Sequence, residues 1–294
     1  MNLDYSLVIA TMERAEPLHE ALTSLSQQSV PPAAVIVVDA SPDDRTRKVC
    51  QQWEGRLPMQ WSKAEVRSAA RQRNQGASRV TTPLIGFMDD DVVLPTDTLA
   101  KLVAPFSAPE TGGVAGRIEG MTHPVPRGLL WCYYRLQAGY SHPHYGGRVI
   151  GPGINLLPAF AVETVQLVPA EWLNSTLVLY RRELFEREKF PAFDGYSFLE
   201  DAHLSHRIGR SHRLYFHGAA PYVHNSQPSR AKADQAALAR MIVHHQRKMA
   251  RDVLGLRGPA LWWKLTLHRA FQTIAVLRSR ASGRWASARG FWSA

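Results

Sequence analysis

The sequence is poor in cysteine and has no long apolar run, and both absences narrow what the chain can be. Only Cys50 and Cys132 occur among its 294 residues, so a disulfide framework is not expected and a reducing compartment fits. The charge-free stretch at residues 149–162 is interrupted by glycine and proline and is not expected to span a bilayer. Near the start, a short apolar run beside Asp4 is not typical of a signal peptide. These features predict a cytoplasmic protein.

Positive charge is in excess, but it is confined to one end of the chain. The formal net charge is +10, and hydrophobic residues make up 45% of the sequence, which is ordinary for a folded protein. Residues 231–294 carry twelve Lys and Arg against Asp234 and Asp252, so the remainder of the chain is neutral. The length allows one large domain or two small ones. The basicity therefore belongs to the C-terminal part, whatever acidic surface that part meets.

The first third of the chain alternates apolar segments with segments of helical spacing. Strands are predicted for residues 5–10, 33–38, 58–63 and 82–89, and helices for residues 17–28, 44–53 and 68–80. This alternation predicts an α/β domain with a mostly parallel sheet, in which ligands bind outside the carboxyl ends of the strands. Thr11, Asp39 and Asp91 fall at such ends, so three polar strand ends are expected to converge on one crevice. Further strands are predicted for residues 171–180, 212–217 and 219–223.

Three consecutive carboxylates, Asp89, Asp90 and Asp91, stand where the strand at residues 82–89 should end. Side chains alternate along an extended segment, so Asp89 and Asp91 are expected on one side and Asp90 on the other. Two carboxylates on one side would repel each other unless a cation lies between them, and hard divalent ions take carboxylate oxygens as ligands. The alternative is a solvated acidic turn or a helix N-cap.

Two groups near the same strand ends suit a nucleotide. Asp39 follows an apolar run, where a carboxylate can accept the ring N–H of a pyrimidine base; the alternative is a turn or capping role. Arg71, Arg73 and Asn74 lie in a short predicted helix and would suit a diphosphate, because Arg makes bidentate phosphate contacts. The alternative for this second group is a solvated basic helix face.

A second acidic site, Glu200-Asp201, precedes a predicted helix that ends near Gly209. An adjacent carboxylate raises the cost of ionising its neighbour, which is one way to obtain a base for proton transfer. The alternative is a carboxylate pair that favours the helix dipole. His224 is an available metal ligand, although no second ligand lies near it in sequence. Trp172 is a candidate for stacking on a sugar ring, with core packing as the alternative.

Taken in order, several segments resemble one known family. They are residues 8–15 (Val-Ile-Ala-Thr-Met-Glu-Arg-Ala), 22–28, 37–41, 73–76 (Arg-Asn-Gln-Gly), the Asp triplet, and Phe193-Asp194 with Glu200-Asp201-x-x-Leu204-x-x-Arg207. This set resembles family 2 glycosyltransferases of the GT-A fold over residues 5–225. The chain departs from the family pattern at Ala10 and Glu13, where Pro and Asn are frequent, and at residues 172–174, where a Gly-rich stretch is frequent.

The resemblance implies a GT-A, Rossmann-like, mostly parallel sheet and inverting transfer from a nucleoside-diphosphate sugar, with UDP-sugar expected, to a glycan or polyprenyl-linked saccharide acceptor. It implies Mn²⁺ or Mg²⁺ as cofactor. The implied roles are the nucleoside for Thr11, Arg14 and Asp39, the nucleotide for Arg73, the ribose or donor sugar for Asp90, the metal for Asp91, Asp89 and His224, and proton transfer for Asp201 as general base, paired with Glu200.

The domain prediction separates a body from a tail. Residues 1–228 are expected to form the transferase domain, with a nucleotide-binding half over 1–105 and an acceptor-side half over 106–228. Residues 229–294 are expected to form a basic, aromatic-rich helical extension. Basic residues interleaved with Trp, Phe and Leu suit an interfacial helix on anionic lipid, which predicts a peripheral protein at the inner face of the cell membrane. The alternative is packing on the body or pairing with another subunit.

Two other classes of protein compete with this interpretation. A nucleic-acid-binding protein would explain the basic tail, but it leaves the acidic strand ends unexplained and no recognised motif is present, so nucleic acid is not the expected partner. A nucleotidyltransferase on a related fold usually has a Gly-rich phosphate loop near the first strand. Residues 10–20 contain no glycine, which ranks this class third.

Overall fold

The computed structural model describes residues 3–121, 125–158, 167–193, 198–226, 234–280 and 283–293. The chain divides into two compact units. The first comprises residues 1–123 and 160–227, and the second comprises residues 124–159 and 228–294. The second unit therefore combines the basic C-terminal part with a segment from the middle of the sequence.

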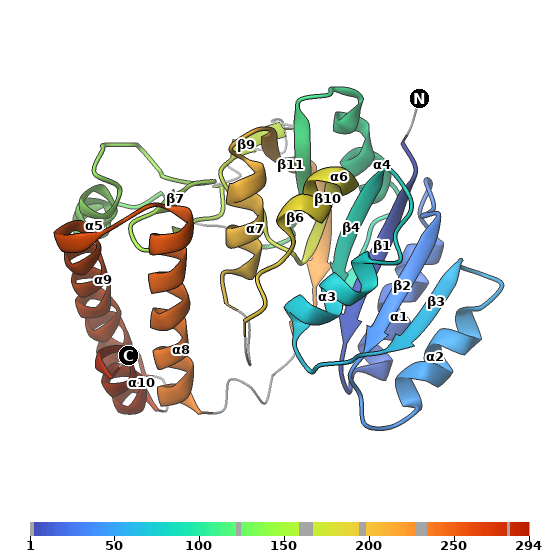
Figure 1. Ribbon diagram of the computed structural model, residues 1–294, viewed down its shortest axis with the longest axis horizontal. Coiled ribbons are helices and arrows are strands. Elements are labelled where there is room, and N and C mark those ends of the chain that lie inside the picture. Colours follow the sequence, from blue (N-terminus) through green and yellow to red (C-terminus); the bar gives the residue numbers. More distant parts are fainter. Residues whose placement is uncertain are drawn as a thin grey trace. The chain divides into compact units, whose positions relative to one another are not determined.

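The first unit is built on one mixed sheet, most of whose strands are parallel (Figure 1). Its strand order is β3 (Met59–Lys63), β2 (Ala34–Asp39), β1 (Tyr5–Thr11), β4 (Leu84–Asp89), β10 (Leu177–Arg181), β6 (Thr111–Ile118), β11 (Arg213–His224) and β5 (Val92–Val93), and β9 (Leu167–Ala170) also pairs with β11. The strands from β3 to β4 are parallel, whereas β10 is antiparallel to both of its neighbours. The predicted fold class is confirmed.

Successive side chains of a strand point to opposite faces of the sheet, and in the parallel half the side chains of both faces are buried. Helices therefore cover both faces. The helices of this unit are α1 (Ala15–Ser26), α2 (Arg45–Trp53), α3 (Ala69–Ala77), α4 (Thr98–Val103), η1 (Ala104–Ser107), α6 (Arg182–Glu188) and α7 (Glu200–Ile208). Leu7 and Ile9 join the core cluster that contains the apolar face of α1. On the other face α3 lies so close that a Cβ at Gly76 would be 2.4 Å from Val8 Cγ1. This close approach directs Arg73, one turn earlier, toward the sheet.

Two predicted strands differ from the structure. The strand predicted over residues 171–180 begins only at Leu177, because Leu173 is buried in a connection and its N–H donates to Ser205 Oγ at 3.0 Å. The break predicted between residues 217 and 219 is a register shift inside the single strand β11, between His217 and Pro221. Both segments contain strands of the sheet, as predicted, so only the predicted bounds of these strands are wrong.

The second unit is mainly helical (Figure 1). Its elements are α5 (Gly128–Ala138), the short hairpin of β7 (Val149–Ile150) and β8 (Ile154–Asn155), α8 (Gln235–Lys248), the π-helical turn η3 (Met249–Val253), α9 (Gly258–Arg278) and α10 (Arg284–Trp292). At its centre Tyr133 stacks on Phe271 with ring centroids 3.9 Å apart, and the buried His268 ring contacts Tyr133 and Gln246. Among the described residues, no helix is both long and apolar enough to cross a membrane.

Candidate functional site

The carboxyl ends of the parallel strands bring the first predicted site residues together. In the strand registers Thr11 pairs with Asp39, and Ala10 pairs with Asp89. Three polar positions that lie far apart in sequence are therefore neighbours along one edge of the sheet. Thr11 and Asp39 are buried, and Asp39 Oδ1 accepts the N–H of Ser41 at 2.8 Å. Parallel strands place ligands at this edge, as the sequence predicts.

A candidate metal centre lies at the end of β4. Asp89, Asp91 and His224 each offer a ligand atom, and these atoms all lie within 4.8 Å of one another. His224 comes from the last residue of β11, which pairs with Val92 of β5 and thereby reaches the Asp triplet. The His224 Nε2 atom lies 3.2 Å from Asp91 Oδ1, and the hydrogen bond to Asp91 raises the pKa of His224. The partner that His224 lacks in sequence is supplied by strand pairing.

The donor set fits a divalent cation. Two carboxylates and one imidazole are ligands that first-row divalent ions such as Mn²⁺ accept, and carboxylates alone also suit Mg²⁺. Beside Asp91 there is a cavity of about 570 Å³ that is also lined by Glu16, Glu20 and Asn225. Although Asp91 is only 4% exposed, it therefore borders a space that solvent ions can enter.

Arg14 neutralises the other side of the triplet. Its Nη1 donates to Asp90 Oδ1 at 3.0 Å and to Asp91 Oδ2 at 2.8 Å. Asp89 and Asp91 offer atoms to one site as predicted, and Asp90 meets the same Arg14 nitrogen as Asp91, because β4 ends at Asp89 and regular alternation stops at the turn. Burial raises the pKa of Asp90 to about 6, although hydrogen bonding to Thr11 and the charge of Arg14 act in the opposite direction. Without Arg14, two adjacent buried carboxylates would repel each other.

Arg73 joins the triplet to the second acidic site. Arg73 is 6% exposed, and its guanidinium donates to Asp89 Oδ1 at 2.7 Å and to Glu200 Oε1 at 3.2 Å and lies 5.6 Å from the centre of the Phe190 ring. Residues from α3, β4 and α7 thus meet at one buried cation. The guanidinium thus binds two carboxylates of the protein itself, whereas the sequence predicted that Arg73 contacts a diphosphate.

The acidic pair Glu200-Asp201 opens α7, after Leu199 in the left-handed region at φ 65°. Burial raises the pKa of both carboxyl groups, and each is also affected by its neighbours, so the pair holds protons more tightly than free carboxylates do. Glu200 is held by Arg73, whereas Asp201 Oδ1 accepts the N–H of Ala202 at 2.7 Å. Asp201 is also the more accessible of the two, which suits exchange of a proton with a ligand.

One residue of this edge was missed by sequence analysis. Trp61 of β3 lies beside Asp39, with its indole Nε1 3.4 Å from Asp39 Oδ2, and Arg47 lies 5.0 Å from the centre of its ring. The predicted strand 58–63 contained the signal, since in a parallel register Trp61 pairs with Val37, two residues before Asp39. A half-buried aromatic ring next to this carboxylate adds a flat surface to the edge.

Trp172 lies elsewhere in the packing. It is 4% exposed and meets the ring of Phe216 edge-on at 5.8 Å between centroids. The alternative of core packing describes this side chain as the structure has it, because almost none of its ring is accessible for stacking on a sugar. A role for Trp172 in stacking on the acceptor sugar is therefore not proposed.

Solved structures of two proteins share this fold. Mannosyltransferase PcManGT from Pyrobaculum calidifontis, in complex with GDP-Man and Mn²⁺, has a TM-score of 0.60 and 19% identity, covering 97% of this chain and 78% of that chain. S. aureus TarS 1-349, in complex with UDP-GlcNAc, has a TM-score of 0.54 and 18% identity, covering 96% and 75%. The chain spans 44% of the longer TarS structure. No curated protein matches the chain by sequence.

The sheet order, together with these likenesses, defines the class as the GT-A fold of glycosyltransferases. Residues 6–131 match the family model described as Glycosyl transferase family 2. This match and the shared fold support a glycosyltransferase, and the predicted resemblance to family 2 is confirmed over residues 6–131.

Proposed function

We propose that the protein transfers a sugar, with inversion, from a nucleoside-diphosphate donor to a hydroxyl of a saccharide acceptor. The observation that carries this proposal is the placement of two carboxylate sites on one buried cation. Asp89 of the candidate metal centre and Glu200 of the acidic pair are both bonded to Arg73. A site for the leaving diphosphate and a site for proton removal thus lie within reach of one substrate.

The donor end is assigned to the strand edge. Asp91, Asp89 and His224 would hold Mn²⁺ or Mg²⁺, which when bound neutralises the charge that grows on the leaving nucleoside diphosphate. Asp39 and Thr11, with Trp61 beside them, would hold the nucleoside, and Arg14 and Asp90 would contact its ribose or phosphate side. We expect the donor to be a UDP-sugar. Because PcManGT is in complex with GDP-Man and TarS with UDP-GlcNAc, binding of UDP and of GDP should both be measured.

The acceptor end is assigned to the acidic pair. As the acceptor oxygen forms its bond to the anomeric carbon and the bond to the donor phosphate breaks, Asp201 accepts the hydroxyl proton. A carboxyl whose pKa is raised by burial is a stronger base than a free one once it is ionised. Glu200 orients this end through Arg73, so Arg73 is proposed as a positioning residue that holds Asp89 and Glu200 rather than as a nucleotide ligand.

The acceptor itself is proposed to be a glycan or a polyprenyl-linked saccharide at a membrane. The second unit contains twelve of the chain's Lys and Arg residues within residues 231–294 and exposes several tryptophans. Such a surface is attracted to anionic lipid headgroups, and we assign it to the inner face of the cell membrane.

Calorimetric titration with UDP and GDP, each with and without Mn²⁺ or Mg²⁺, tests the donor site. We expect one nucleotide to bind only with metal, and Asp91→Asn to lower that metal-dependent affinity by at least about 10- to 100-fold, which is the effect of losing a group that only supports a metal ligand. The control is Asp97→Asn, which removes a carboxylate paired with Lys101 on the surface of the same unit. Metal-independent binding, or equal loss in both variants, would contradict the assignment. Oligonucleotide binding in place of nucleotide binding would favour the nucleic-acid alternative.

A further inference from the structure

The second unit carries an apolar groove that the proposed transfer reaction does not use. The groove has a volume of about 780 Å³ and lies between the C-terminal half of α9 and α10. Leu277, Ala288, Trp285 and Trp292 provide most of its lining, and Arg289 stands in it as the single charged group. Its size is in the range of pockets that hold small organic ligands, about 300–1,000 Å³.

The tryptophans that line this groove are exposed rather than packed. Trp285 is 63% exposed and Trp292 is 51% exposed, although Phe291 between them is buried against α8. The two residues are seven positions apart on α10, so they lie on the same side of that helix, with Arg289 between them. Trp292 Nε1 donates to Thr273 Oγ1 at 2.9 Å, which fixes this ring across the groove. Large exposed aromatic surface of this kind marks an interaction site.

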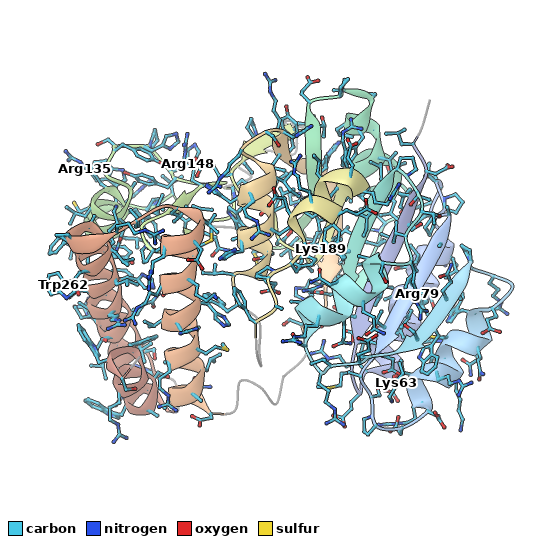
Figure 2. The ribbon with its side chains drawn as sticks, in the orientation of Figure 1. Lys63, Arg79, Arg135, Arg148, Lys189 and Trp262 are labelled. Atoms are coloured by element: carbon cyan, nitrogen blue, oxygen red, sulfur yellow. The ribbon has the colours of Figure 1, made fainter. Side chains whose placement is uncertain are left out.

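Every charged residue from Arg278 to the end of α10 is an arginine, and one of them, Arg289, lines the groove. Arg278 ends α9, Arg280 follows it, and Arg284 and Arg289 belong to α10. Arg284 Nη1 donates to Ser279 O at 3.2 Å. No Asp or Glu follows Asp252 in the sequence. An occupant of this groove therefore combines a hydrocarbon part with a negative group. Figure 2 shows that Trp262, near the other end of α9, also points outward.

We infer that the groove between α9 and α10 binds one anionic membrane phospholipid, with an acyl chain along Leu277 and Ala288 and the phosphate at Arg289. Tryptophan favours the boundary between headgroups and acyl chains, and arginine reaches from an apolar surface to phosphate. This inference rests on the membrane part of the proposed function and deepens it, because it names the segment that enters the lipid. Nucleic acid fits less well, since the lining is aliphatic as well as aromatic.

Vesicle binding by the full chain tests the inference. We compare phosphatidylcholine vesicles with vesicles that also contain phosphatidylglycerol, and we expect binding only to the second kind. Leu277→Glu places a carboxylate in the groove and is expected to weaken binding about tenfold, because apolar contact is lost and like charge is added. The matched control is Ile274→Glu, which adds the same charge to an exposed position of α9 outside the groove lining and is expected to have a smaller effect.

Fluorescence identifies the segment directly. Phospholipids brominated on the acyl chain quench tryptophan at the lipid boundary, so quenching is expected to fall in Trp285→Phe/Trp292→Phe and to persist in Trp262→Phe/Trp263→Phe. Equal effects in both double variants, or Leu277→Glu no weaker than Ile274→Glu, would overturn the groove as the site. Absence of vesicle binding by the wild type, or binding of an oligonucleotide instead, would overturn it as well. Metal-dependent nucleotide binding is measured on the same variants, so that a failure of the proposed donor site can be distinguished from a failure of the groove proposal.

Discussion

Among the described residues of the unit built on the sheet, four carboxylates (Asp39, Asp90, Asp91 and Glu200) are buried, whereas the helical unit holds only Asp234 and Asp252 as acidic residues. Each buried carboxylate of the first unit has a cationic or backbone partner, as Asp90 and Asp91 have in Arg14. The helical unit instead buries neutral polar groups at its centre, around His268, and none of its described arginines is fully buried.

The difference in charge and burial between the two units determines which kind of ligand each unit can bind. A buried carboxylate keeps its charge more readily beside a cation or a hydrogen-bond donor, so the carboxylates of the first unit would suit a metal ion together with a phosphate. Surface arginines beside tryptophan keep most of their hydration and gain energy when they meet a large anionic surface. The two kinds of charge therefore suit two different partners, and separate experiments can test them.

The largest effect is expected at the base. Asp201→Asn removes the proton acceptor without changing the size of the side chain, and it should lower the transfer rate by about 100- to 10,000-fold. Donor binding should survive, because Asp201 is not part of the candidate metal centre. The measurement is sugar transfer in a coupled nucleotide-release assay, together with calorimetry of the nucleotide and metal. Loss of donor binding in Asp201→Asn would reject its assignment as the base.

A smaller but still large effect is expected at the buried cation. Arg73→Gln leaves Asp89 and Glu200 near each other without compensation, and removing one partner of a buried ion pair typically costs about 3–5 kcal/mol of unfolding free energy. Urea unfolding of the variant measures this loss. Arg45→Gln is the control, because Arg45 pairs with Asp43 in an exposed position where little stability is at stake. Similar midpoints for Arg73→Gln and the wild type would show that the cation does not hold the two acidic sites together.

Arg73→Lys separates the charge from the geometry of the guanidinium. Lysine keeps a positive charge but cannot donate to Asp89 and Glu200 from a planar fork. We expect most of the stability to return and the transfer rate to remain low, with weaker metal binding because Arg73 holds Asp89, but with little change in nucleotide affinity once the metal is saturating. A nucleotide affinity that falls in parallel with the rate even at saturating metal would instead favour the direct nucleotide role expected from the sequence.

The smallest effect is expected in the helical unit, as a response to pH. Burial lowers the pKa of His268 from 6.5 to about 4. The unfolded chain then binds a proton at a higher pH than the folded unit does, so this unit should lose stability as pH falls from about 6.5 toward 4. The loss attributable to His268 should reach at most about 3 kcal/mol.

Urea unfolding at pH 7 and pH 4.5, followed by tryptophan fluorescence, measures this response, since five of the eight tryptophans belong to the helical unit. His268→Gln cannot take up the proton and should show a flatter pH dependence than the wild type. Equal pH dependence in the two proteins would mean that other groups cause the acid sensitivity.

Much of the sheet could be predicted from local patterns. The strands β1, β2 and β4 are short, mostly apolar runs that end at a polar residue, so their ends at Thr11, Asp39 and Asp89 could be predicted within a residue or two. The connection at residues 171–176 was not, because buried Trp172 and Leu173 look like strand residues while their backbone bonds elsewhere. An apolar pattern reports burial, but it does not report which backbone partner a residue has.

The sequence by itself determined the order of strands and helices in the first third of the chain, the acidic strand ends and the basic C-terminal part, because these depend on residue types within a few positions. Only the tertiary structure decided that β11 carries His224 to Asp91, that Arg73 lies between Asp89 and Glu200, and that α10 leaves a groove against α9. Each of these meetings joins segments separated in the chain. They depend on strand pairing and helix packing, which no local pattern contains.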